Sequence, residues 1–347
     1  MANGRTPVVQ AGHNGRYLGE LTMTIDRGVL AVDGCQAHPI DDTILGDAAI
    51  SQIIEGFKRR VTELVFIPRG FAIDQPLVRI EKDLPNTSSD LAASTILANL
   101  CTDAFRKATG AQIALTANGL MRNGLSRGKT GVQTVYDVFA VAPLGRGVLD
   151  ATPGNTLVTG YLTGKEIKNV LEFCLSGSPA RPGDYFPRAS GLRFTYDPAR
   201  PQFDMVTDVA LGDLDHGYSA IDITAADSQI YGITSPLFFA LILVAIPKFT
   251  DGRLTLVAKD KHGKPLKSRV AAVAIPLRET PDLLLQAGTS IDVVEMVGSS
   301  AQGDHVEIKE WQAIIYYLRA LPAAGAGELP IVPTDVRANE PRFIRVS

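Results

Sequence analysis

The spacing of apolar residues changes along this chain, and the change limits the possible folds more than any other feature. In the first forty residues apolar and polar side chains alternate, which predicts strands over 17–25 and 28–32, with Asp26 and glycines at the turn. From Asp47, a plausible N-cap, apolar residues recur every three or four positions, which predicts a helix ending near Phe66. The chain therefore starts as a small antiparallel sheet and continues into a helix.

Helical and strand patterns then alternate. Ser88 or Ser89 is expected to cap a second helix that Gly110 ends, and a buried strand over 112–116 leads into the loop 117–129. Thr163 and Glu166 have the spacing of a capping box. The helix behind that box carries an inward stripe of Ile167, Val170, Leu171 and Cys174. One more helix is expected late in the chain, with a single apolar face of Ile308, Trp311, Ile315 and Leu318. These patterns predict a mixed α and β architecture.

Charge and hydropathy exclude two classes of partner. The formal net charge of the 347 residues is only -3 and the basic residues are scattered, so we expect no nucleic acid partner. The longest apolar run, Pro236–Pro247, is shorter than the roughly 18 residues of a membrane-spanning helix, so we expect buried core and no membrane span. The N-terminal residues have neither an apolar signal core nor a small-residue cleavage site, so export cannot be read from them.

One loop has the composition of an anion site. The strand ends in Thr116-Ala117-Asn118-Gly119, and Arg122, Arg127 and Lys129 follow in a glycine-punctuated loop. Glycines let backbone amides approach a phosphate or carboxylate, and arginine offers a planar fork to its oxygens. The alternative interpretation is a solvated basic loop without a ligand.

The segment ANLCTDAFRKATGAQIALTANGLMR resembles the start of the C-terminal domain of the 5'-nucleotidase family. That family has a G-N-L-x-x-D-A-h-R helix, a strand and then N-G-G-G-I-R. The resemblance covers Asn99, Asp103 and Arg106 in the helix and Asn118 and Arg122 in the loop, although two loop glycines are missing. TVYDVFAVAPLG and LTGKEIKNVLE are similar to the next two family motifs, in the same order.

Upstream, TPVVQAGHNGRYLGEL is similar to the last hairpin of the family's metallophosphatase domain. The resemblance implies a remnant of that domain over 1–46, an interdomain linker helix over 47–68, and the C-terminal substrate-binding domain over 69–347. The expected fold class is α+β, with the mixed sheet of the family's C-terminal domain.

The resemblance also implies the substrate-binding residues. Arg146 and Asn155 bound a loop in which Asn155 matches the family's loop asparagine, and Asn118 and Arg122 hold the substrate. DYFPRASGLRFTYD places Phe186 at a position that stacks on a nucleobase, and YGITSPLFF offers Phe238 as the second ring. The alternatives are that Phe186 is a core residue or that the adjacent Tyr185 is the stacking ring. The family's Gly-Gly-Asp-Gly is replaced by 241–244, so the acid that binds the ribose is absent.

By this resemblance the chain is the substrate-binding part of a bimetallic phosphohydrolase of nucleotide catabolism, periplasmic or extracellular. Two divalent metal ions are implied for a missing N-terminal metallophosphatase domain, because the family's metal motifs are not found in this chain, which we expect to hold no cofactor and to be inactive alone. The expected ligand is a nucleotide or a related phosphate ester. Two alternatives remain open: a related hydrolase for a non-nucleotide substrate, of the thiosulfohydrolase type, or a non-catalytic binding module.

Overall fold

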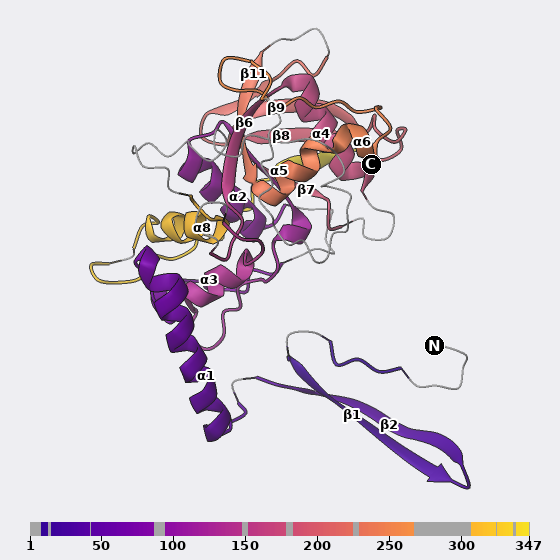
Figure 1. Ribbon diagram of the computed structural model, residues 1–347, viewed down its shortest axis with the longest axis vertical. Helices are drawn as coiled ribbons and strands as arrows, with labels where there is room; N and C mark the ends of the chain where they lie inside the picture. Colours follow the sequence, from indigo (N-terminus) through magenta and orange to yellow (C-terminus); the bar gives the residue numbers. More distant parts are fainter. Residues whose placement is uncertain are drawn as a thin grey trace. The chain divides into compact units, whose positions relative to one another are not determined.

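The computed structural model divides the chain into two compact units, Met1–Val61 and Thr62–Ser347, each of which is considered by itself. Both are drawn in Figure 1. The residues that the structure describes are 8–12, 15–41, 43–86, 94–147, 152–177, 183–224, 229–266, 307–323, 325–335 and 338–346.

The first unit contains an antiparallel hairpin of β1 (Tyr17–Asp26) and β2 (Val29–Pro39), as the alternating pattern predicts. The register shifts once, between Thr22 and Met23, where Asp33 of β2 has no opposite residue. Because side chains alternate between faces, a strand without this bulge would turn its second half over. The bulge therefore keeps apolar residues on one face along the whole hairpin.

That apolar face is not covered within the first unit. Met23 and Ile25 on β1 are 47% and 72% exposed, and their partners Val32 and Leu30 on β2 are also exposed. The opposite face is mostly polar, with Leu18 and Val29 as exceptions, and carries its own contacts, such as Thr24 Oγ1 to Asp33 Oδ2 at 2.6 Å. The hairpin is thus amphipathic, with an open apolar side.

The predicted helix follows as α1 (Ala48–Val61). Asp47 caps it as expected, because its Oδ1 accepts from the backbone N–H groups of Ala49 and Ile50, each at 2.9 Å. The second unit starts with a π-helical turn (Thr62–Phe66) and a 3-10 turn (Ile67–Arg69) that ends at Gly70. No residue of α1 is buried.

The second unit contains both of the larger sheets, with helices packed around them (Figure 1). Its elements are β3 (Pro76–Arg79), α2 (Ile96–Thr109), β4 (Ile113–Ala117), a 3-10 turn (Asn118–Leu120), β5 (Val132–Thr134), α3 (Val135–Val141), β6 (Leu157–Thr163), α4 (Gly164–Ser176), β7 (Pro187–Ser190), β8 (Leu192–Tyr196), β9 (Val206–Asp213), β10 (Gly217–Ala220), β11 (Ile230–Pro236), α5 (Leu237–Val244), α6 (Ile246–Phe249), α8 (Glu310–Arg319) and β12 (Phe343–Arg345).

Both larger sheets are mixed, which confirms the expected α+β class. One has the order β6-β11-β4-β7, in which β11 runs parallel to β4 and antiparallel to β6. The other has the order β10-β9-β8-β12, in which β12 runs parallel to β8. A short antiparallel pair, β3 with β5, completes the pairing of this unit's named strands.

Two large apolar cores flank β4. Ala114 faces the core that α2, α3 and α8 share, where Trp311 is completely buried. Leu115 faces the other core, which includes α4 residues and β8. The second helix begins at Ile96 with Thr95 as its N-cap, whereas the expected caps Ser88 and Ser89 lie outside the described residues.

Two further sequence predictions can be compared with the structure. The capping box is confirmed at α4, where the side chains of Thr163 and Glu166 each bond the other's backbone N–H. The run expected as buried core forms α5 and α6, with Leu243 and Ile246 in the core beside α4. Among the described residues, no helix has the length and apolar character needed to cross a membrane.

Candidate functional site

The candidate site begins where β4 ends. The backbone N–H of Asn118 donates to the Phe186 carbonyl at 3.0 Å, and that of Gly119 donates to the Asp184 carbonyl at 2.8 Å. A Cβ on Gly119 would lie 3.0 Å from Cβ of Asp184, so glycine is what allows this close approach. The strand-end loop and the segment that precedes β7 are therefore held together.

The side chain of Asn118 is buried in this contact. Its Oδ1 accepts from Nε of Arg188 at 3.1 Å, and both residues are almost completely enclosed. The Arg188 guanidinium carbon lies 5.1 Å from the centroid of the Phe186 ring and 5.7 Å from that of Phe343. Two of the predicted site residues, Asn118 and Phe186, thus share one neighbour that the sequence did not single out.

Arg122 lies at the outer side of the same loop and is exposed. Its Nη1 donates to the Gly119 carbonyl at 3.1 Å, and its backbone N–H donates to the Val141 carbonyl at 2.7 Å. The second bond fixes the loop to the end of α3. Arg146, also exposed, follows Val141 by five positions, so both arginines flank the end of this helix.

Phe186 and Phe238 both contribute to the core beside α4. Phe186 is 4% exposed and meets Phe343 and Tyr196 edge to face, with ring centroids 4.9 Å and 6.2 Å away. Phe238, in the first turn of α5, is half-buried. Their arrangement as a clamp around a ligand stays a prediction.

Asn155 is directed toward α8. Its Nδ2 donates to Oε2 of Glu310 at 2.9 Å, and its carbonyl accepts from the Glu310 backbone N–H at 3.0 Å. Glu310 is 2% exposed, and burial raises the pKa of its carboxyl group to about 8. Asn155 therefore anchors its loop to α8 through a buried carboxyl group.

Two glycines make that anchor possible. At Gly145, whose φ is +83°, a Cβ would lie 2.0 Å from Oδ1 of Asn155. At Gly154, whose φ is +110°, a Cβ would lie 2.7 Å from the indole ring of Trp311. The Trp311 indole N–H in turn donates to the Pro153 carbonyl at 2.9 Å. The loop between α3 and β6 thus rests directly on the start of α8.

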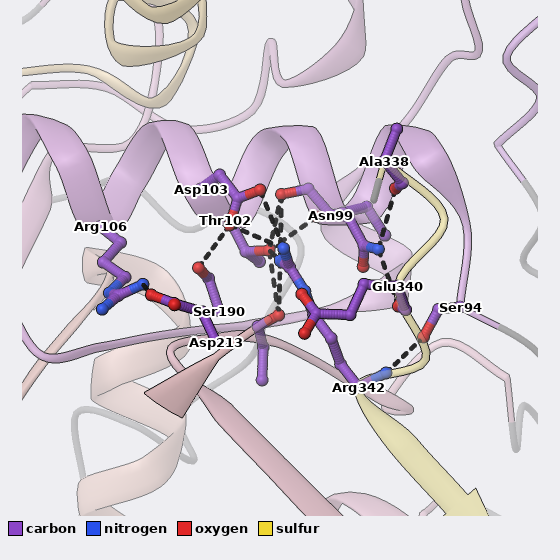
Figure 2. Close-up of polar contacts among 12 residues, drawn as sticks. Ser94, Asn99, Thr102, Asp103, Arg106, Ser190, Asp213, Ala338, Glu340 and Arg342 are labelled. Atoms are coloured by element: carbon purple, nitrogen blue, oxygen red, sulfur yellow. Dashed lines mark hydrogen bonds and ion pairs between the residues drawn. The ribbon is translucent and has the colours of Figure 1, made fainter. Parts of the chain in front are cut away.

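The helix motif Asn99, Asp103 and Arg106 forms a separate polar network (Figure 2). Nη2 of Arg342 donates to Oδ2 of Asp103 at 2.8 Å, while Arg106 pairs with Asp213 at 3.2 Å. Nη1 of Arg342 also donates to the carbonyls of Asn99 and Ala189 and to Oγ1 of Thr102. The motif residues therefore join α2 to the segment that enters β12 and to the β9–β10 turn.

This network borders a cavity of about 750 Å³, which α2, the β9–β10 turn, the end of α8 and residues within 332–335 and 338–342 line. Its charged lining is mixed and includes two ion pairs: Asp103 with Arg342, and Asp213 with Arg106. None of the six predicted site residues lines it. The network's role in this structure is to hold distant segments together.

Metal binding is not supported by the described residues. Within the ranges given above, no group of three or more His, Cys, Asp or Glu side chains could hold a metal ion. The residues present in those ranges therefore do not fit a two-metal centre. The sequence did not reveal Arg188 or Glu310, because the partners of each lie far away along the chain.

Comparison with known proteins shows which family part of the chain resembles. Residues 76–227 match the family model described as 5'-nucleotidase, C-terminal domain. The trifunctional nucleotide phosphoesterase protein YfkN of Bacillus subtilis (strain 168) is 29% identical over 197 residues, which are 55% of this chain and 12% of YfkN.

Solved structures show the same fold. A 5'-nucleotidase precursor from Thermus thermophilus is 20% identical with a TM-score of 0.55, over 96% of this chain and 50% of that one. The sulfate thiohydrolase SoxB from the same organism, in complex with glycerol, is 15% identical with a TM-score of 0.50, over 96% of this chain and 45% of SoxB. The chain thus spans half or less of the length of these relatives.

Proposed function

We propose that this chain is the substrate-binding part of a 5'-nucleotidase-type phosphohydrolase, because residues 76–227 match the family model described as 5'-nucleotidase, C-terminal domain. Its substrate is a nucleotide or a related phosphate ester. We place the protein in nucleotide catabolism, in a periplasmic or extracellular location. The chain contributes substrate recognition, and hydrolysis depends on a separate metal-bearing domain.

The observation that carries this proposal is the contact between the β4 strand-end loop and the Phe186 segment. It brings Asn118, Arg122 and Phe186 into one region, which suits a ligand with an anionic end and an organic body. In this arrangement Arg122 contacts the anionic group from the rim, and Phe186 and Phe238 bound the space for the organic part. Arg146 and Asn155 belong to the loop that begins beside Arg122.

The hairpin supports a partner domain. A two-stranded hairpin is marginal by itself in water, and this one exposes a continuous apolar face. Packing that face against a metallophosphatase domain would remove it from water. Bimetallic chemistry at that domain would supply the attacking hydroxide, while the residues of this chain bind and orient the ester.

Binding of phosphate esters to the chain alone tests the proposal. Isothermal titration with AMP should show one site, and Arg122→Ala should weaken it by about tenfold, because a charge-assisted contact contributes roughly 1.5 kcal/mol. Arg319→Ala, an exposed arginine at the end of α8, serves as the matched control and should leave the affinity unchanged.

Activity provides the second test. The chain with added divalent metal should not hydrolyse a generic phosphate ester, since the described residues offer no metal cluster. Chelator-sensitive turnover by the pure protein would contradict the proposed division of labour. Absence of any binding to phosphate esters would contradict substrate recognition itself.

A second candidate function, hydrolysis of a non-nucleotide substrate, is favoured by one observation. Where the family has an aspartate-bearing glycine loop, residues 241–244 belong to α5, an apolar helix packed on the core. A site without that acid loses its means of selecting a ribose diol. Titration with thiosulfate in place of AMP distinguishes the two functions.

A further inference from the structure

A further cavity, of about 560 Å³, lies beside β3. Residues within three segments line it: 79–81 at the end of β3, 127–132 before and at the start of β5, and 328–331. Its volume falls in the range of roughly 300–1,000 Å³ that is typical of small-molecule pockets. None of the six predicted site residues lines it, so this β3 cavity is distinct from the candidate site described above.

Backbone hydrogen bonds join the three segments of the β3 cavity. The N–H of Arg79 donates to the Pro330 carbonyl at 2.8 Å, and the Arg79 carbonyl accepts from the N–H of Val332 at 2.9 Å. On the other side, the N–H of Ile80 donates to the Gly131 carbonyl at 2.9 Å. A Cβ on Gly131, whose φ is +74°, would lie 2.5 Å from the Ile80 carbonyl oxygen, so glycine is needed for this approach. The positions of the lining residues are therefore fixed by the backbone.

Four charged side chains line the cavity, two of each sign: Arg79, Arg127, Glu81 and Glu328. All four residues are exposed. In the part of the chain that the structure describes, none of the four forms an ion pair, although they border the same space. Both signs of charge are therefore accessible to a ligand that enters the cavity.

The two guanidinium groups are held by the same turn. Nη2 of Arg79 donates to the Thr130 carbonyl at 3.1 Å, and Nη1 of Arg127 donates to the Gly128 carbonyl at 3.4 Å. A guanidinium group has five N–H donors, so each arginine keeps donors for a ligand. Its planar fork matches the two oxygens of a carboxylate. The side of the cavity at this turn therefore suits a carboxylate group.

Apolar side chains lie between the charged groups. Val132 of β5 and Ile331 each pair with Arg79 through the backbone, from opposite sides, so these three side chains share one face. Leu329 also lines the cavity, and it is partly buried, as are Val132 and Ile331. A well-matched ligand would thus combine an apolar body with one anionic and one cationic group.

We propose that the β3 cavity binds a free α-amino acid with an apolar side chain. Arg79 and Arg127 bind its carboxylate, and Glu81 and Glu328 bind its ammonium group. A simple anion would leave the two glutamates unmatched, and a simple amine would leave the two arginines unmatched, whereas an amino acid carries both charges. This site is additional to the proposed function and does not depend on it.

Isothermal titration of the full chain with three matched probes tests the proposal: L-leucine, leucinamide and 4-methylpentanoate. Leucinamide keeps the ammonium group without the carboxylate, and 4-methylpentanoate keeps the carboxylate without the ammonium group. L-Leucine should bind at least about tenfold more tightly than either analogue, because each analogue loses one charge-assisted contact. Equal affinities for the three probes, or no binding of L-leucine, would overturn the proposal.

Two variants assign the two ends of the ligand. Arg127→Gln should weaken L-leucine and 4-methylpentanoate by about tenfold and leave leucinamide unchanged. Glu81→Gln should weaken L-leucine and leucinamide by a similar factor and leave 4-methylpentanoate unchanged. If either variant weakens all three probes equally, or weakens none, the assigned contacts are wrong and the proposal is overturned.

The matched controls are Arg253→Gln and Glu63→Gln. Both residues are exposed and neither lines the cavity, so both variants should bind the three probes as the parent does. Fluorescence of the single, buried Trp311 verifies that each variant is folded before titration.

AMP separates this inference from the proposed function. Arg127→Gln should bind AMP as the parent does, because Arg127 lines the β3 cavity and is not one of the predicted substrate-binding residues. If Arg127→Gln loses AMP binding and keeps L-leucine binding, the cavity serves the phosphate ester and the inference is overturned. If the parent binds L-leucine with the expected selectivity and does not bind AMP, the inference stands and the proposed function fails.

Discussion

The hairpin of the first unit and the α2 region of the second differ in how they complete their contacts. Arg342 reaches across to α2 and bonds five acceptors there and nearby, so that its charge is satisfied inside the unit. The hairpin satisfies only its polar face, for example through Glu20 and His38 at 2.7 Å. A chain can therefore specify a local structure fully while leaving an apolar surface of that structure uncovered.

Substitutions in these two regions should therefore affect different properties, namely unfolding and association. Trp311 is the only tryptophan and is buried in the second unit, so its fluorescence reports the unfolding of that unit and not of the hairpin. Substitutions in the second unit should change the unfolding curve strongly. Substitutions on the open face of the hairpin should change association instead.

The largest expected effect is a dependence of stability on pH through Glu310. Its pKa is raised by burial from 4.5 to about 8, so the folded state keeps a proton that the unfolded state releases. Stability is therefore lost as the pH rises from 4.5 to about 8, by on the order of 5 kcal/mol. Urea unfolding followed by Trp311 fluorescence at several pH values measures this loss.

Glu310→Gln provides the test of that assignment. The amide oxygen can still accept from Asn155, but no proton is released, so the variant should be more stable than the parent at pH 8 and lack this part of the pH dependence. An identical pH profile for parent and variant would show that Glu310 does not control it. The control Glu328→Gln alters an exposed carboxylate and should leave the profile unchanged.

Removal of Arg342 should have the next largest effect. Arg342→Leu leaves the carboxylates of Asp103 and Glu340 without their cation in a largely enclosed network, at an expected cost of about 3–5 kcal/mol. The matched control is Arg200→Leu, because Arg200 pairs with Asp204 at the surface, where such pairs contribute about 1 kcal/mol or less. Equal losses for both variants would contradict the distinction between the regions.

Gly154→Ala should cost about 2–3 kcal/mol. Its φ of +110° disfavours a side chain, and the added Cβ would meet the Trp311 ring at 2.7 Å. Gly252→Ala separates the two causes, because Gly252 has φ +75° but a Cβ there meets nothing within 4 Å, so only backbone strain of about 1 kcal/mol applies. A shifted emission spectrum for Gly154→Ala, and not for Gly252→Ala, would place the disturbance at Trp311.

The sequence predicted those features that depend on near neighbours. The two residues of the capping box, Thr163 and Glu166, are three positions apart, and the cap at Asp47 lies beside the helix that it starts, so local pattern was sufficient. The start of α2 was harder, because Ser88, Ser89 and Thr95 are all good N-cap residues and only the packing of the helix selects among them. The mixed α and β class followed from the same local patterns.

The candidate site depends on distant neighbours, and that is where the sequence was insufficient. Asn155 meets Glu310, which lies 155 positions away, and Arg188 meets Asn118 across 70 positions. No local spacing of residues predicts these pairs, because they form only when the strands pair and α8 packs against the loop. The family resemblance predicted the loop residues and the two aromatic rings. It predicted neither Arg188 over the Phe186 ring nor the Glu310 carboxyl group that bonds Asn155.

The smallest effect on stability is expected on the hairpin, and it sharpens the comparison most. Ile25→Lys places a charge on the apolar face, where Ile25 is 72% exposed, so unfolding reported by Trp311 should change by less than about 0.5 kcal/mol. The same charge should reduce any self-association of the chain, because it interrupts the exposed apolar patch. Thr22→Lys on the polar face is the control and should affect neither quantity.

Sedimentation of the parent and both variants over a range of concentrations measures association directly. If Ile25→Lys destabilised the second unit as much as Arg342→Leu does, the hairpin face would be part of a core and not an open surface.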